Sequence, residues 1–109
     1  MEIEKERVGE VHVVTAQGRL DGIYSAAFAN QVGELITGAN PRILIDFSDI
    51  DYVTSAGLRA VLVLMKKAQA SGGVFALCGV NEQVREVLAI SGFAGLFSVH
   101  PGVPRALRP

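Results

Sequence analysis

The segment Arg42–Leu62, RILIDFSDIDYVTSAGLRAVL, holds a strand, a loop and the start of a helix, and it decides the fold. Its opening run, RILIDF, is short and nearly all apolar, which is typical of a central strand buried on both faces. The next residues, SDIDYVT, are polar and rich in carboxylates and predict a loop. Apolar residues then recur at helical spacing over Ser55–Ala70. A strand that feeds a helix in this way predicts an α/β domain.

The sequence before this segment predicts a hairpin and one helix. Ile3–Arg7 and Glu10–Ala16 are two β-type runs around Val8-Gly9, which is typical of an antiparallel pair with a tight turn. After Gly18 the spacing becomes helical and predicts a helix over Tyr24–Thr37. The hairpin therefore opens the sheet, and the helix leads to the central strand.

The sequence after the segment predicts a strand, a helix and a short edge strand. Val74–Cys78 is an apolar run of strand length. Asn81 is a good N-cap for a third helix, which Gly92 ends and whose inner face carries Val84, Val87 and Leu88. Phe97–Val99 predicts a last edge strand, while the three prolines of the tail Pro101–Pro109 argue against another.

These elements predict one α/β domain over residues 1–109. We expect a sandwich with a central mixed sheet, opened by an antiparallel β-hairpin, with later strands parallel and helices packed on the sheet. A length of 109 residues, 50% of them hydrophobic, suits a single folded core. The net charge of −1, with scattered basic residues, predicts no nucleic-acid partner. We also predict no membrane span and a cytoplasmic location, since no long apolar run or secretory signal is present.

Few side chains offer catalytic or metal-binding chemistry. His12 and His100 lack the neighbours expected of a ligand pair or a catalytic base, and a single cysteine excludes an intrachain disulfide. Asp46, Asp49 and Asp51 invite a divalent metal, but their spacing is not that of a calcium loop and favours a solvated acidic loop. We therefore predict a protein that is not an enzyme and has no metal and no required cofactor.

The junction between loop and helix is the candidate functional site, because ligands and partners gather at the carboxyl ends of strands in open α/β sheets. Ser55 is well placed to cap the helix. Gly57 costs about 1 kcal/mol of helix propensity relative to alanine. We therefore expect it to clear space above Ser55. The alternative is that Thr54 or Ser55 serves only as an N-cap.

Three stretches resemble one known family. DFSDIDYVTSAGLRAVL (Asp46–Leu62) resembles the signature of the anti-sigma factor antagonist family, the STAS domain: a strand, Asp-Leu-Ser, an apolar position and a Ser-Gly-Leu helix start. GRLDG (Gly18–Gly22) resembles that family's Gly-x-Leu-Asp turn. VREVLAISGFAGLFSVHPGVPRAL (Val84–Leu107) resembles its last helix, glycine turn and short strand. The resemblance covers nearly the whole chain and implies a STAS-type sandwich.

The resemblance also implies a function and its residues. In this family the serine at the position of Ser55 is phosphorylated by a partner that is both serine kinase and anti-sigma factor. The unphosphorylated chain would bind that partner, the phosphorylated chain would be released, and a serine phosphatase is a further implied partner. Thr54 stands where the family often has Asp, which leaves Thr54 as the alternative acceptor. The implied partner-binding residues are Asp21, Asp46, Ser48, Thr54, Ser55, Ala56, Gly57, Leu58 and Arg59, with Leu58 expected to face the core.

The switch has a physical explanation. A phosphate carries nearly two negative charges, which a helix N-terminus tolerates within the domain but which an interface repels near Asp21, Asp49 or Asp51. Two alternatives stay open. One is an accessory module of a transporter or other assembly that docks through the Ser55 region without phosphorylation. The other is nucleotide binding, without catalysis, near Asp21 and Ser55.

Overall fold

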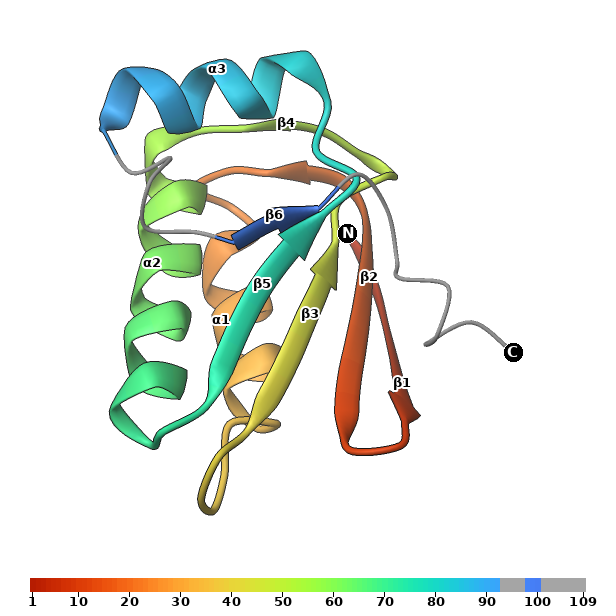
Figure 1. Cartoon of the computed structure of the whole chain (residues 1–109). Coiled ribbons are helices and arrows are strands. Elements are labelled where there is room, and N and C mark those ends of the chain that lie inside the picture. The colour runs from red at the N-terminus through yellow and green to blue at the C-terminus, as the bar shows by residue number, and fades with distance from the viewer. Residues whose placement is uncertain (93–97, 101–109) are drawn as a thin grey trace.

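A mixed β-sheet carries helices on one face in the computed structural model, which describes residues 1–92 and 98–100 (Figure 1). The described elements are, in order, β1 (Glu2–Val8), β2 (Val11–Leu20), α1 (Ser25–Gly33), β3 (Arg42–Asp46), β4 (Ile50–Val53), α2 (Ser55–Ala70), β5 (Val74–Cys78), α3 (Glu82–Ser91) and β6 (Ser98–His100). The strand order is β1-β2-β3-β5-β6, and β4 pairs with β2. Strands β1 and β2 are antiparallel and every other pair is parallel, which confirms the predicted mixed sheet.

The main core lies between the sheet and helices α1 and α2, which run side by side along one face (Figure 1). Helix α3 crosses over β4. The buried side chains of this core include Val14, Ile43, Ile45, Phe75 and Leu77 from the strands, Phe28 and Val32 from α1, and Leu58, Val61, Leu64 and Met65 from α2. Burial of each large apolar side chain stabilises the fold by about 1.5–3 kcal/mol, so this layer holds the helices on the sheet.

Strand β3 lies between β2 and β5, as its apolar run predicts. Ile43 and Ile45 belong to the main core, whereas Leu44 belongs to a smaller buried cluster with Val13, Ala76 and Cys78. Successive side chains of a strand point to opposite faces, so both faces of β3 are buried. This is why the run is almost continuously apolar.

Strand β4 corrects the sequence prediction, which assigned all of SDIDYVT to a loop. Ile50–Val53 pairs in parallel with Gly18–Leu20 at the far end of β2. Ile50 and Val53 are buried, but Asp51 is exposed and Tyr52 half-buried, so the segment shows no continuous apolar run. The pairing also lengthens β2, which reaches Leu20 rather than the predicted Ala16, with an irregular register between Gly18 and Arg19.

Helix α1 is shorter than predicted, since it ends at Gly33 rather than Thr37. After Gly33 the chain tightens: the N–H of Leu35 donates to the carbonyl of Val32, and that of Ile36 to Gly33. Such bonds span three residues instead of four. Ile36 is still buried, so the apolar spacing that predicted a longer helix is satisfied by this tighter turn.

The C-terminal elements agree with prediction where the structure describes them. Helix α3 begins after Asn81 and ends at Gly92, whose φ of 79° lies in the left-handed region that favours glycine. Val84 and Leu88 are buried and Val87 is partly buried. Strand β6 is the predicted edge strand; Phe97 and the tail 101–109 lie outside the described residues. Among the described helices, none is long and apolar enough to cross a membrane.

Asn81 ties α3 to β4. Its Oδ1 accepts from the N–H of Val84 at 2.9 Å, which caps the helix. Its Nδ2 donates to the carbonyls of Ile50 and Asp51, at 3.1 and 2.8 Å. Gln83 adds a two-way contact with the backbone of Val53. The two side chains therefore bind the backbone of β4 along its side that faces α3.

We expect Asn81→Ala to lower the free energy of unfolding by about 2 kcal/mol, because it removes the cap and both bonds to β4. Urea unfolding measures this change. Asn81→Asp retains the oxygen that caps α3 but not the amide donor to β4, so its loss of unfolding free energy should be intermediate. Asn30→Ala, at an exposed position in α1, is the matched control and should stay within about 0.5 kcal/mol. Equal losses for Asn81→Ala and Asn30→Ala would contradict this role.

Candidate functional site

Thr54 joins β4 to α2 and fixes where the helix begins. It has extended backbone angles, φ −93° and ψ 174°, and its Oγ1 accepts from the N–H of Gly57 at 3.4 Å. Its N–H donates to the carbonyl of Leu20 at 3.0 Å, and its hydroxyl donates to the same oxygen at 3.5 Å. The N-cap is therefore Thr54, which corrects the prediction that Ser55 caps the helix.

Ser55 is the first residue of α2 and is exposed. Within the described residues, its hydroxyl makes no hydrogen bond, because Thr54 already supplies the cap. The hydroxyl thus faces solvent at the positive end of a helix of 16 residues. An accessible hydroxyl in this position is what a modifying enzyme needs.

Gly57 is buried, and it serves the packing of α2 rather than access to Ser55. A Cβ on Gly57 would lie 2.9 Å from the carbonyl carbon of Leu20 and nearer still to the carbonyl oxygen. Real Cβ atoms do not approach other atoms this closely. The predicted close approach exists, but its partner is the end of β2, which corrects the prediction that Gly57 clears space above Ser55. Leu58 is buried in the core, as predicted.

Asp21 shapes the loop beside Ser55. This carboxylate is only 9% exposed. Its Oδ1 accepts from the N–H groups of Ile23 and Tyr24, at 2.9 and 3.2 Å, and its Oδ2 lies 3.3 Å from Arg19 Nε. These bonds hold the β2–α1 turn in shape and leave Ile23 74% exposed. Asp21 therefore supports the surface around Ser55 more than it forms that surface.

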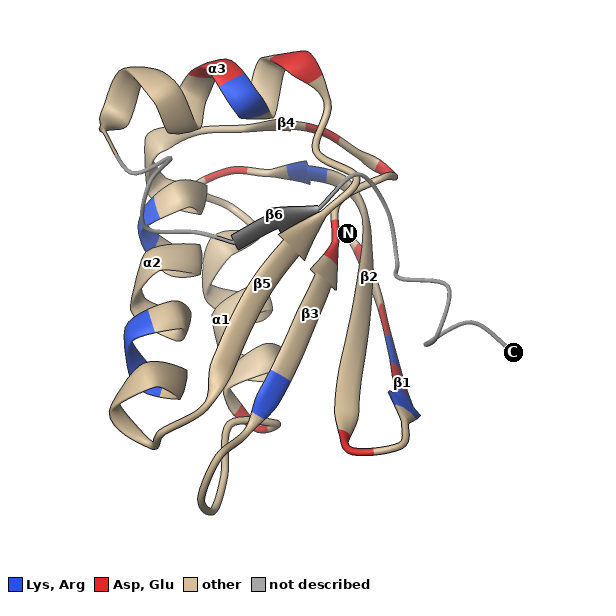
Figure 2. Cartoon of the chain, in the orientation of Figure 1, with Lys and Arg blue, Asp and Glu red and all other residues tan. Residues whose placement is uncertain are grey.

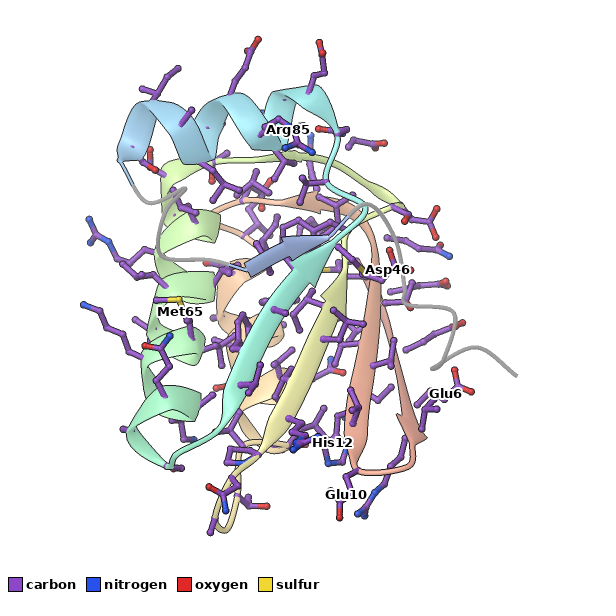
Figure 3. All side chains as sticks on the ribbon, viewed as in Figure 1. Glu6, Glu10, His12, Asp46, Met65 and Arg85 are labelled. Carbon is purple, nitrogen blue, oxygen red and sulfur yellow. The ribbon has the colours of Figure 1, made fainter. Side chains whose placement is uncertain are left out.

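Asp46 and Ser48 do not join this site. The Asp46 Oδ1 accepts from both the N–H and the hydroxyl of Ser48, which closes the turn from β3 to β4. Figure 3 shows Asp46 at the carboxyl end of β3, away from α2. Within the described part of the chain, no three His, Cys, Asp or Glu side chains form a metal-binding group.

Two grooves meet at Ser55 and Arg59. The α2–α3 groove, of about 410 Å³, is lined by Ser55, Leu58, Arg59, Leu62, Val87, Ile90 and Ser91. The α1–α2 groove, of about 480 Å³, is lined by Ser25, Ala26, Ala29, Ser55, Ala56, Arg59, Ala60 and Val63. Ser55 and Arg59 thus form a ridge between two apolar hollows, and among the described residues Arg59 is the single charged residue in either lining.

Exposed apolar side chains lie in both groove linings and in the turn between β2 and α1. Ile23, Val63 and Ile90 are 74%, 58% and 87% exposed. Among the described large apolar residues only Val74 is similarly exposed, and it lies at the amino end of β5. Exposed apolar patches of this kind are typical of protein-binding surfaces. These residues were not predicted. The available signal was that Val63 and Ile90 are apolar at helix positions outside the buried stripe.

A third hollow, of about 600 Å³, lies at the other end of the molecule and contains none of the predicted site residues. Arg7, Glu10, His12 and Arg42 are among its lining residues. Figure 3 shows His12 and Glu10 at that end of the sheet. The larger hollow is therefore separate from the site at the start of α2.

The sequence pattern of the STAS domain family matches residues 2–106, and this chain belongs to that family. Among its relatives is BtrV of Bordetella bronchiseptica, whose name describes it as an anti-sigma factor antagonist; it is 28% identical over 91% of this chain and 85% of its own length. The anti-sigma F factor antagonist of Paenibacillus polymyxa is also 28% identical, over 98% of this chain and 92% of its own.

The fold is also that of SpoIIAA, an anti-sigma factor antagonist from Bacillus. Its unphosphorylated form superposes with a TM-score of 0.73 and 21% identity, over 90% of this chain and 87% of that one. Its phosphorylated form has also been solved, with a TM-score of 0.68. The predicted STAS-type sandwich is thereby confirmed.

We expect Gly57→Ala to destabilise the protein by about 2 kcal/mol, although alanine gains about 1 kcal/mol of helix propensity, because the added Cβ collides with the Leu20 backbone. Thermal and urea unfolding measure this loss. Gly33→Ala in α1 is the matched control: its Cβ would lie 3.8 Å from Leu64 Cδ2, an ordinary contact. Gly33→Ala should be neutral or stabilising. A Gly57→Ala protein as stable as Gly33→Ala would refute the packing role.

Proposed function

We propose that this protein is an anti-sigma factor antagonist whose binding is switched off by phosphorylation of Ser55. The observation that carries the proposal is the exposed Ser55 hydroxyl, which makes no hydrogen bond to the described residues and lies on a ridge between two apolar grooves. Unmodified, this surface would dock an anti-sigma factor and so release a sigma factor. The names of BtrV and of the Paenibacillus protein support the assignment.

The partner in this proposal is an anti-sigma factor that is also a serine kinase. It transfers the γ-phosphoryl group of ATP to Ser55 Oγ; the new P–O bond replaces the bond to ADP, and the hydroxyl proton passes to a base of the kinase. A serine phosphatase hydrolyses the ester and restores binding. The activity requires the cytoplasm, where ATP and sigma factors are found.

Thr54 is the poorer acceptor because its hydroxyl is already used. It accepts from Gly57 and donates to Leu20, so a phosphate on Thr54 would remove the donor to Leu20 and place a dianion at the half-buried junction of β4 and α2. A phosphate on Ser55 leaves these bonds intact and adds negative charge at a helix N-terminus, where it is tolerated. The fold thus survives modification at Ser55, and the change is confined to the docking surface.

The same surface explains how phosphorylation weakens binding. An apolar interface excludes water, and a dianion buried in it loses hydration without compensation. Ser55 lies in the lining of both grooves, so its phosphate would face any partner that covers the ridge. We therefore expect the affinity to fall at least about tenfold.

Phosphorylation assays with each serine-kinase anti-sigma factor of the source organism test the proposal. With the cognate kinase and ATP, mass spectrometry should find one phosphate, on the peptide that contains Ser55. Ser55→Ala should stay unmodified and still bind the kinase, because the hydroxyl makes no structural bond to described residues. Thr54→Ser, which retains a capping hydroxyl, should be phosphorylated normally.

Ser71→Ala removes a different serine, at the far end of α2, and is the control. It should be phosphorylated and should bind the kinase as wild type does. Undiminished phosphorylation of Ser55→Ala would reject the proposal. Binding of a partner without any phosphorylation of the wild-type chain would favour an accessory module of a larger assembly. Isothermal titration calorimetry with ATP and GTP tests whether the protein itself binds a nucleotide. We propose no nucleotide site on this chain.

A further inference from the structure

Arg59 lies one helical turn after Ser55. Residues four apart on a helix are neighbours, with about 5–6 Å between their Cβ atoms. Long helical side chains lean toward the N-terminus of their helix, so a side chain at position 59 covers the turn that contains position 55. Ser55 and Arg59 accordingly line both grooves together. A group attached to Ser55 Oγ would enter the reach of the Arg59 guanidinium.

The charge of Arg59 is uncompensated within the described residues. Its side chain is exposed, and the two ion pairs in this part of the chain join Lys5 to Glu34 and Arg19 to Asp21. Helix α2 contains three cations and no acidic residue (Figure 2). Helix α1 has no charged residue, and the α3 side chains in the groove lining, Val87, Ile90 and Ser91, are uncharged. Among the residues that the structure describes, a phosphate on Ser55 would therefore meet one cation and no anion in either lining.

We propose that Arg59 binds the phosphate of phosphorylated Ser55 within the same helix, and that this ion pair is part of the switch. The inference rests on the proposed function, in which Ser55 is the phosphoacceptor. Guanidinium and phosphate match in a two-pronged geometry and form strong charge-assisted hydrogen bonds. Phosphorylation then adds negative charge and also occupies Arg59, the cation that the unmodified ridge offers to an acidic group of the partner.

If Arg59 pairs with the phosphate, phosphorylation weakens partner binding by two separate effects. Repulsion and desolvation at the interface depend on the phosphate alone. Loss of the Arg59 cation depends on Arg59, so it disappears in Arg59→Gln. In that variant the unmodified chain should bind its kinase about threefold to tenfold more weakly, and phosphorylation should reduce binding by a smaller factor than in wild type.

Phosphorus NMR of the isolated protein tests the ion pair without any partner. Phosphoserine is incorporated at position 55 during synthesis, and the second pKa of the phosphate is read from the ³¹P shift during a pH titration. A neighbouring cation favours the dianion and lowers this pKa. We expect the phosphate pKa to be about 0.3–0.5 unit lower in the protein with Arg59 than in Arg59→Gln. This difference should shrink in 0.5 M salt, because the screening length there is about 4 Å.

Lys66→Gln is the matched control, since Lys66 is an exposed cation on the same helix but three turns away from Ser55. It should leave the phosphate pKa within about 0.1 unit of wild type. Arg59→Lys retains the charge without the planar fork and should give an intermediate pKa. A double-mutant cycle compares the thermal unfolding of four proteins, with and without the phosphate and with Arg or Gln at position 59. The phosphate and Arg59 together should change the unfolding equilibrium constant by about twofold more than the sum of their separate effects on the free energy predicts.

Equal phosphate pKa values for the wild-type and Arg59→Gln proteins would overturn the inference. That result would leave the proposed function untouched, because the titration does not use a kinase. Failure of every anti-sigma kinase to modify Ser55 would instead reject the proposed function. The two failures are therefore distinguishable, and far-UV circular dichroism confirms that each variant compared is folded.

Discussion

The close contact between Gly57 and the backbone of Leu20 sets the geometry of the whole site. Leu20 is the last residue of β2 and is fully buried, and its carbonyl accepts the N–H of Thr54. Because Gly57 has no side chain, the first turn of α2 can lie directly on this carbonyl. The contact binds the start of α2 to the same strand end that pairs with β4. Strand β4, the cap and the first turn of α2 are thus held by one point of the sheet.

In this arrangement some residues at the start of α2 make structural contacts, and their neighbours stay exposed. Thr54 and Gly57 are committed to backbone contacts, and Leu58 is committed to the core. Ser55 and Arg59 are left on the outside, between two apolar grooves. A charge added to Ser55 therefore changes the surface without disturbing the contacts that support it. That separation is the physical requirement for a switch that alters binding and preserves the fold.

Several elements could be predicted because their signals are local. The strand RILIDF, the helix Ser55–Ala70 and the Asn81 cap follow from apolar spacing and from the preferences of single residues. Strand β4 escaped prediction because its pairing with β2 is a contact between distant segments. Helix α1 was predicted too long because apolar spacing does not distinguish a helix from the tighter turn that follows Gly33.

For the site, the sequence by itself determined where the candidate site lies: a serine and an arginine four residues apart at the start of a helix that follows a strand. Only the tertiary structure decided what each residue does. Whether Thr54 or Ser55 caps α2 depends on the backbone direction as the chain leaves β4. What Gly57 touches depends on where β2 ends, and which apolar residues stay exposed depends on how α1 and α3 pack beside α2. Local propensity carries no information about the last two, because the partners of Gly57 in β2 and of α2 in α1 and α3 lie more than twenty residues away in the chain.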